Sequence, residues 1–208
     1  MNRTTRPFGS WTTEITPDVL ASANLRLAWP EILDDGSFVW LEGRPAEQGR
    51  YVVVRQRRGS PAEDLLPAPF NARSRVHEYG GLPFAFFGDE LLFVGDGDQR
   101  LHRATSSAAP APLGSATKFR LAEMRLDARR HRLVAVAEHH GDEGHPENGL
   151  VAIDLGNGTI EWLLRGHDFF AAPAISPNGE ELAYLAWDQP HMPWDAASLE
   201  WSVSSPPP

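Results

Sequence analysis

The 208-residue sequence contains no cysteine. This absence excludes disulfide bonds, zinc sites built on thiolates and cysteine nucleophiles. The sequence also has no apolar run approaching the roughly 18 residues that cross a membrane, and its first residues include no apolar segment typical of a secretory signal. We therefore expect a cytoplasmic location and no interaction with a membrane.

Basic residues are scarce relative to acidic ones. The chain has 19 Lys and Arg against 28 Asp and Glu, which gives a formal net charge of -9. Because a nucleic-acid-binding surface is normally basic, we expect no nucleic-acid partner.

The string Gly-x-Ser-x-Gly, which places a nucleophilic serine between a strand and a helix in α/β-hydrolases, is absent as well. A Ser-His-Asp triad assembled from other residues would lack the sharp turn that exposes the nucleophile. We therefore expect no catalytic residue in this chain, and the sequence indicates no cofactor.

The residues that are present favour an all-β protein. Glycine and proline, 18 of each, are scattered along the chain, and there are seven tryptophans. Short apolar strands recur at residues 37–43, 90–96, 132–139 and 181–188, each after a turn sequence. Measured at Phe38, Leu91, Leu133 and Leu182, these strands are 53, 42 and 49 residues apart. A period of about 45–50 residues with four strands in each repeat is typical of the blades of a β-propeller.

Four blades are predicted, at residues 26–70, 71–117, 118–167 and 168–203. Residues 1–25 precede them and include a short helix near 16–23, with Thr16 as N-cap and Pro17 as the first helical residue. Residues 204–208 are expected to be a disordered proline-rich tail, because proline lacks the N–H that a further strand needs. The expected fold is a partial propeller of about three complete four-stranded blades and an incomplete fourth. Its open sheet edges favour self-association.

Several strings, in this order, resemble one known family. They are Trp-Leu-Glu-Gly-Arg-Pro at 40–45, Arg-Val-His-Glu-Tyr-Gly-Gly at 75–81, Asp-Gln-Arg-Leu at 98–101 and Met-Pro-Trp-Asp at 192–195. Together they resemble the N-terminal propeller of prolyl-oligopeptidase-family serine peptidases, in particular the acylaminoacyl-peptidase and dipeptidyl-aminopeptidase branch. The resemblance implies that the propeller covers the active site of an α/β-hydrolase domain, which bears a Ser-Asp-His triad, and that it selects substrates by size.

Three functions are compatible with this pattern. On the resemblance, the chain is the scaffold and substrate gate of a peptidase and is not catalytic by itself; its partners are a peptide substrate and the hydrolase domain. The Ser-Pro-Asn-Gly string at 176–179 is also typical of TolB-like propellers, so the alternative is a stand-alone propeller that binds a protein partner. A truncated remnant without function is the third.

The candidate substrate- or interface-facing residues are Arg75, His77, Glu78, Tyr79 and Trp194. A carboxylate such as that of Glu78 can hold the amino terminus of a peptide by a charge-assisted hydrogen bond. The structural alternative is that His77 and Tyr79 tie neighbouring loops together. For Trp194, the alternatives are an aromatic rim for a ligand and a cap on a long loop.

Two other polar groups have a structural interpretation. Residues 138–145 contain three histidines and three carboxylates, which are competent metal ligands. Because nothing in their spacing fixes a geometry, we interpret them as a solvated loop and expect no metal site. Asp98, Gln99 and Arg100 are interpreted as a hairpin brace.

Overall fold

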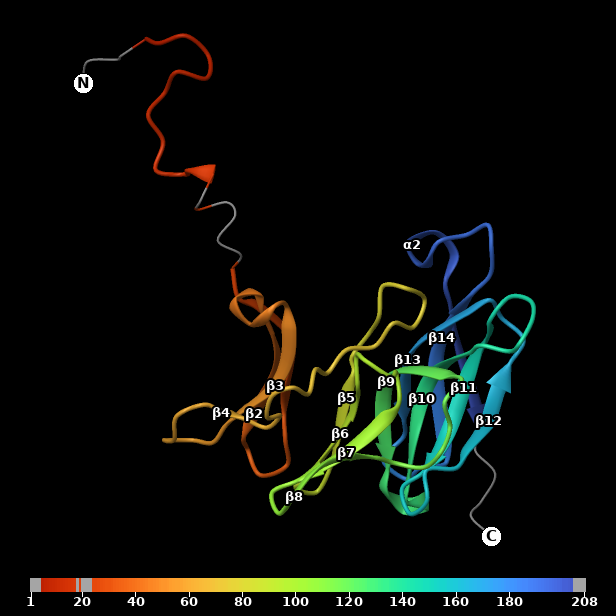
Figure 1. Cartoon of the computed structure of the whole chain (residues 1–208). Coiled ribbons are helices and arrows are strands. Elements are labelled where there is room, and N and C mark those ends of the chain that lie inside the picture. Colours follow the sequence, from red (N-terminus) through yellow and green to blue (C-terminus); the bar gives the residue numbers. More distant parts are fainter. Residues whose placement is uncertain (1–4, 18, 20–23, 204–208) are drawn as a thin grey trace.

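The computed structural model describes residues 5–17, 19 and 24–203. These residues form four antiparallel sheets that follow one another along the chain like blades (Figure 1). Three of the sheets have four strands and the fourth has three. The expected all-β propeller architecture is confirmed.

Within every sheet the strands pair in sequence order. The first sheet consists of β1 (Arg26–Ile32), β2 (Phe38–Arg44), β3 (Arg50–Gln56) and β4 (Glu63–Asp64). The second consists of β5 (Phe84–Phe87), β6 (Glu90–Val94), β7 (Leu101–Thr105) and β8 (Ala108–Pro112). The third consists of β9 (Phe119–Asp127), β10 (Arg132–His139), β11 (Glu147–Asp154) and β12 (Ile160–Arg165). The fourth consists of β13 (Phe169–Ile175), β14 (Glu181–Trp187) and β15 (Ser198–Val203).

Helical segments are short. Between residues 24 and 203 they are the 3₁₀ turns η1 (Pro45–Glu47) and η2 (Ala128–Arg130) and the single turn α2 (Pro193–Ala196). The helix predicted near 16–23 falls largely on residues 18 and 20–23, outside the described residues. The capping bond expected of Thr16 is present, because its hydroxyl oxygen accepts the N–H of Val19 at 3.2 Å.

The strongly apolar strands of the repeat are the second strand of each sheet: β2, β6, β10 and β14. The turn before β14 shows how such a strand is started. Gly179 adopts φ +70° and donates its N–H to the carbonyl of Ser176 at 2.7 Å. The side chain of Asn178 accepts the N–H of Glu180 at 3.1 Å. Glycine tolerates the left-handed backbone, and asparagine replaces a backbone partner in the turn.

The hydrophobic core consists of three clusters, one between each pair of consecutive sheets. In β6, Phe93 belongs to the first cluster and Leu92 to the second. In β10, Leu133 belongs to the second and Val134 to the third. Successive side chains of a strand point to opposite faces, so each inner sheet packs against both neighbours. Burying one such side chain contributes roughly 1.5–3 kcal/mol, and the array is therefore held together mainly by sheet-on-sheet contact.

The first strands of successive sheets contact one another, β5 with β9 and β9 with β13. Three first strands carry a β-bulge at which a residue other than glycine has positive φ: Trp29 at +53°, Glu123 at +52° and Ala172 at +50°. The surrounding triplets are Ala-Trp-Pro, Ala-Glu-Met and Ala-Ala-Pro. The bulges are a structural repeat that the sequence analysis did not detect.

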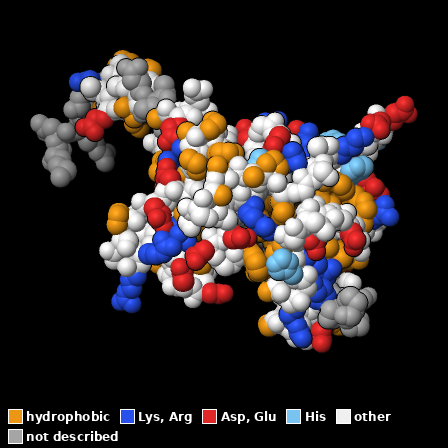
Figure 2. All heavy atoms as spheres, turned by 60° about the horizontal axis from the view of Figure 1, so that its bottom comes forward, with side chains coloured by type: hydrophobic (Ala, Val, Ile, Leu, Met, Phe, Trp, Pro, Cys, Tyr) orange, Lys and Arg blue, Asp and Glu red, His pale blue; other side chains and the backbone are white. Residues whose placement is uncertain are grey.

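The antiparallel pairing sorts the connections onto two faces. The turns from first to second and from third to fourth strands lie on one, which we call the turn face. The loops from second to third strands and the linkers between sheets lie on the other, the loop face, where α2 is seen in Figure 1. Acidic and basic side chains are interspersed over the surface shown in Figure 2.

The two ends of the array have no neighbouring sheet among the described residues. On the first sheet, Leu27 is 68%, Ile32 69% and Phe38 54% exposed. On the fourth, Leu199, Trp201 and Val203 alternate along β15 and are 75–76% exposed. We call these apolar surfaces the first and second end faces.

Candidate functional site

Four of the five candidate residues lie in the linker from β4 to β5, on the loop face. The linker turns sharply there: His77 has φ +52° and Glu78 has φ +67°. The N–H of Gly80 donates to the carbonyl of Val76 at 2.8 Å and closes the turn. Positive φ at two consecutive residues other than glycine is strained, so the contacts around the linker hold it in this shape.

His77 packs into the third and fourth sheets. Its backbone N–H donates to Oε2 of Glu138, the second-last residue of β10, at 3.1 Å. Its ring meets the ring of Phe169 edge-on at 5.2 Å. Burial lowers the pKa of His77 below its ordinary value, although the charge of the Glu138 carboxylate opposes the shift. The imidazole is therefore neutral near pH 7.

An arginine of β9 joins the linker to the buried carboxylate. Arg120 Nη1 lies 2.6 Å from Oε1 of Glu78 and 3.6 Å from Oε2 of Glu138, and donates to the carbonyl of Arg75 at 3.1 Å. The Glu138 side chain is 8% exposed and that of Glu78 is 79% exposed. The hydrogen bond from Arg120 holds the pKa of Glu78 below its ordinary value, so Glu78 presents a carboxylate at the surface.

Arg75 is fixed by the loop between β6 and β7. Its guanidinium lies 2.9 Å from Oδ1 of Asp96, and its N–H donates to Oε1 of Gln99 at 2.8 Å. Gln99 in turn donates its side-chain amide to the carbonyls of Arg73 and Asp96, each at 3.1 Å. Gln99 thus braces the linker against the second sheet, and Arg75 pairs with Asp96.

Tyr79 and Trp194 are the more exposed candidates. The Tyr79 hydroxyl lies 3.4 Å from Nδ1 of His77, and Tyr79 also lines a cavity beside the first sheet. Burial, with the charges of Glu123 and Glu138, raises the pKa of Tyr79. Trp194 lies in α2, within the loop from β14 to β15, and is 76% exposed. None of the contacts found among the described residues joins Trp194 to the His77 linker.

The histidine-rich run after β10 is divided between separate contacts. His139 packs against the ring of Phe119 at 4.7 Å, and Nε2 of His140 lies 3.4 Å from Glu138. Within residues 5–17, 19 and 24–203, no group of three or more His, Asp or Glu side chains is placed to hold a metal ion. The part of this run that matters at the linker is Glu138. Sequence reasoning had interpreted residues 138–145 as a solvated loop, whereas Glu138 is a buried residue of β10, and it had not singled out Arg120.

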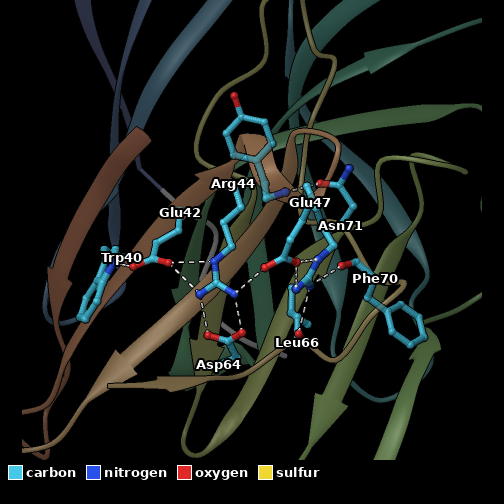
Figure 3. Close-up of polar contacts among 10 residues, drawn as sticks. Trp40, Glu42, Arg44, Glu47, Asp64, Leu66, Phe70 and Asn71 are labelled. Atoms are coloured by element: carbon cyan, nitrogen blue, oxygen red, sulfur yellow. Dashed lines mark hydrogen bonds and ion pairs between the residues drawn. The ribbon is translucent and has the colours of Figure 1, made fainter. Parts of the chain in front are cut away.

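The string at 40–45 forms a polar network on the first sheet (Figure 3). Glu42 accepts hydrogen bonds from the Trp40 indole at 2.9 Å and from Arg44 at 2.7 and 2.9 Å. Arg44 also reaches both oxygens of Asp64, at 2.5 and 2.7 Å, and this contact holds the pKa of Asp64 low. Because the network ties β2 to the short β4, this string has a structural role in the blade.

Successive antiparallel sheets, joined by linkers that meet on one face, define the chain as a β-propeller. No family model and no curated protein matches it. Among solved structures, a puromycin-hydrolyzing peptidase of Mycobacterium tuberculosis matches 98% of the chain with 34% identity and a TM-score of 0.85. A puromycin hydrolase matches 98% with 33% identity and a TM-score of 0.83. The chain belongs to the prolyl-oligopeptidase family of serine peptidases, and it corresponds to the N-terminal propeller of these two enzymes.

The chain spans about a third of the length of those peptidases, 34% in each case. TolB from Acinetobacter baumannii matches 86% of the chain with 15% identity and a TM-score of 0.60. Identity this low shows the propeller fold alone. No helix among the described residues is long and apolar enough to cross a membrane.

Proposed function

We propose that this chain is the scaffold and substrate gate of a prolyl-oligopeptidase-family peptidase. The observation that carries the proposal is the match to puromycin-hydrolyzing enzymes over 98% of the chain at 34% identity. Puromycin joins an amino acid to a nucleoside, so a small aminoacyl or peptidyl compound is the proposed substrate class. The chain by itself turns over no substrate, because it has no nucleophile elbow.

The loop face supports this proposal, because exposed charge there is held in place by buried contacts. Glu78 presents its carboxylate to solvent while Arg120 and Glu138 fix its position. A carboxylate that is ordered before binding costs less to engage with an ammonium group than a mobile one. We propose that Glu78, with His77 and Tyr79, faces the amino terminus of the substrate, that Arg75 supports the linker, and that Trp194 contacts the hydrolase domain.

The same proposal gives roles to the remaining features. The three-stranded sheet of β13, β14 and β15 is an incomplete blade that gains an outer strand from a further segment of the peptidase. The two end faces pack against further blades or against other chains. The location is the cytoplasm, in agreement with the absence of cysteine.

The test is a chimera in which residues 5–203 replace the aligned third of the Mycobacterium tuberculosis enzyme. We expect the chimera to hydrolyse puromycin and the chain alone to be inactive. Glu78→Gln in the chimera should change the ratio of kcat/KM between a free-amino substrate and its N-acetylated form. The matched control is Arg58→Gln, an exposed residue in the turn-face hairpin after β3, which should leave that ratio unchanged.

Two results would contradict the proposal. One is a folded chimera that binds no substrate. The other is hydrolysis by the isolated chain that a single Ser→Ala change in it abolishes.

A further inference from the structure

A cavity of about 500 Å³ is lined by the first sheet, by the linker from β4 to β5 and by Glu123 of β9. Its volume lies within the range of roughly 300–1,000 Å³ that is typical of small-molecule sites. The apolar part of its lining, which we call the floor, includes Ala28, Leu41, Ala72 and Pro83. The aromatic residues Trp29, Tyr51 and Tyr79 line the cavity as well. The cavity therefore suits a ligand with an apolar part.

Two arginines at this cavity differ from Arg75, which is paired with Asp96. Arg26 and Arg73 both line it, and no carboxylate of the described residues lies within ion-pair distance of either guanidinium. Glu123 is the one carboxylate in the lining, and it already accepts the N–H of Ala172. Two unpaired cations beside an apolar floor are notable in a chain whose net charge is -9. Together they favour an anionic ligand.

The backbone and side chain of Arg73 are held in place. Its N–H donates to the carbonyl of Val94 at 2.9 Å, and its carbonyl accepts from Gln99 at 3.1 Å. Its guanidinium lies over the ring of Tyr51, 5.8 Å from the centroid. A cation over an aromatic face is attracted by the ring quadrupole, so the guanidinium is oriented before any ligand arrives.

Gly43 allows these groups to come together. A Cβ at position 43 would lie 2.9 Å from Cε1 of Tyr51 and 3.3 Å from Cβ of Arg26. Only glycine leaves room for the Tyr51 ring at this point of β2. The side chains of Arg26 and Tyr51 therefore converge at the mouth of the cavity.

We propose that this cavity binds the C-terminal carboxylate of a short peptide. The guanidinium groups of Arg26 and Arg73 engage the carboxylate, since the planar fork of arginine matches its two oxygens. The last side chain of the peptide lies on the apolar floor. The inference rests on the proposed function and adds to it: the gate recognises peptides by a free C-terminus as well as by size.

Titration calorimetry on the whole chain tests this, with acetyl-Gly-Gly-Phe and its C-terminal amide as probes. We expect the acid to bind and the amide to bind at least tenfold more weakly, which corresponds to about 1.4 kcal/mol. Arg73→Gln should weaken binding of the acid about tenfold and leave the amide unchanged. Arg73→Lys keeps the charge and loses the planar fork, so its affinity for the acid should lie between those of the parent chain and Arg73→Gln. Arg58→Gln is the control, and thermal unfolding of each variant reports whether it is folded.

The outcomes separate this inference from the proposed function. Equal binding of acid and amide, unaffected by Arg73→Gln, would overturn the carboxylate site and leave a peptide-facing role standing. Competition by inorganic phosphate as strong as by the acid would show a general anion site and overturn the peptide assignment. If neither peptide binds, the proposed carboxylate site is wrong. The hydrolysis assay of the chimera then tests independently whether the chain is the substrate gate of a peptidase.

Discussion

Glu138 is the residue on which the order of the loop face depends. Its carboxylate is buried and contacts the N–H of His77, the guanidinium of Arg120 and the ring of His140. A buried charge is costly unless it is paired and hydrogen-bonded. The partners from β9 and from the loop after β10 belong to the third sheet, and His77 belongs to a linker 61 residues away, so Glu138 joins that linker to the third sheet.

We expect Glu138→Gln to lower the free energy of unfolding by roughly 1.5–3 kcal/mol, the usual cost of losing hydrogen bonds to a charged group. Urea denaturation followed by tryptophan fluorescence measures the change. The matched control is Glu78→Gln, which removes the exposed partner of the same Arg120 and should cost less than about 0.5 kcal/mol. Equal losses in the two variants would show that burial does not distinguish the two carboxylates.

At the residue scale, the site role of the polar cluster at 75–79 stays a prediction, and the structure adds the contacts that hold these residues on the loop face. The partnership of His77 with Glu138 spans 61 residues. It depends on the packing of two sheets, and no local pattern signals it. A usable signal for Arg120 was its charge near the start of strand β9, where it can reach the linker.

At the scale of elements, the second strands were predictable because two signals agree there. An apolar run follows a turn of glycine, asparagine or aspartate, as at Pro177-Asn178-Gly179 before β14. The bulges at Trp29, Glu123 and Ala172 were missed, because none of these residues favours positive φ. Tertiary contacts impose that backbone: the N–H of Glu123 bonds the carbonyl of Leu82 at 2.8 Å.

A histidine ties strand β15, which pairs with β14 along its length, to the linker before β13. His167, in the linker before β13, lies 2.8 Å from Asp188 and 3.2 Å from Glu200 of β15. Glu200 also accepts the hydroxyl of Tyr184 at 2.9 Å; burial first, and then this bond, raises the pKa of Tyr184 to about 12. The hydrogen bond to Asp188, with the nearby charge of Glu200, raises the pKa of His167 above its ordinary value of 6.5.

This shift predicts the sign of a pH dependence. A histidine whose pKa is raised on folding contributes its full stability below pH 6.5 and loses it as the pH rises through the folded-state pKa. We therefore expect the amides of Glu200 and Ser202, which the register pairs with Tyr184 and Leu182 of β14, to exchange faster as the pH rises above 6.5 than the intrinsic rate alone predicts. Hydrogen exchange measured by NMR tests this.

The control for that experiment is His167→Gln, which should remove the additional pH dependence. His77 does not produce the same pH dependence. Because its pKa is lowered on folding, its contribution to stability is lost as the pH falls below 6.5, not as the pH rises. Identical exchange profiles in the variant and the parent chain would show that His167 does not hold β15.

At the scale of the whole molecule, the two inner sheets are covered on both faces, whereas in the part of the chain that the structure describes each end sheet is covered on one face only. Every inner face is covered by a neighbour and contributes to one of three core clusters. The end faces carry similar apolar side chains with nothing against them among the described residues. The two end faces differ from each other, so contact between copies joins the first end face of one to the second of another. Such a heterologous contact closes into a ring or continues as an open chain.

We expect the 208-residue chain to associate through these end faces, because burying apolar surface contributes roughly 25 cal/mol per Å². Two copies with four sheets each can close one ring of eight, within the range of about 4–8 blades found in propellers.

Light scattering coupled to size-exclusion chromatography measures the mass of the assembly. Trp201→Glu and Phe38→Glu, one on each end face, should each reduce the assembly to single chains. Trp194→Glu is the matched control: Trp194 is 76% exposed and Trp201 75%, but Trp194 lies on the loop face and its replacement should leave the mass unchanged. A parent chain that stays monomeric at high concentration would show that the exposed end faces do not pair.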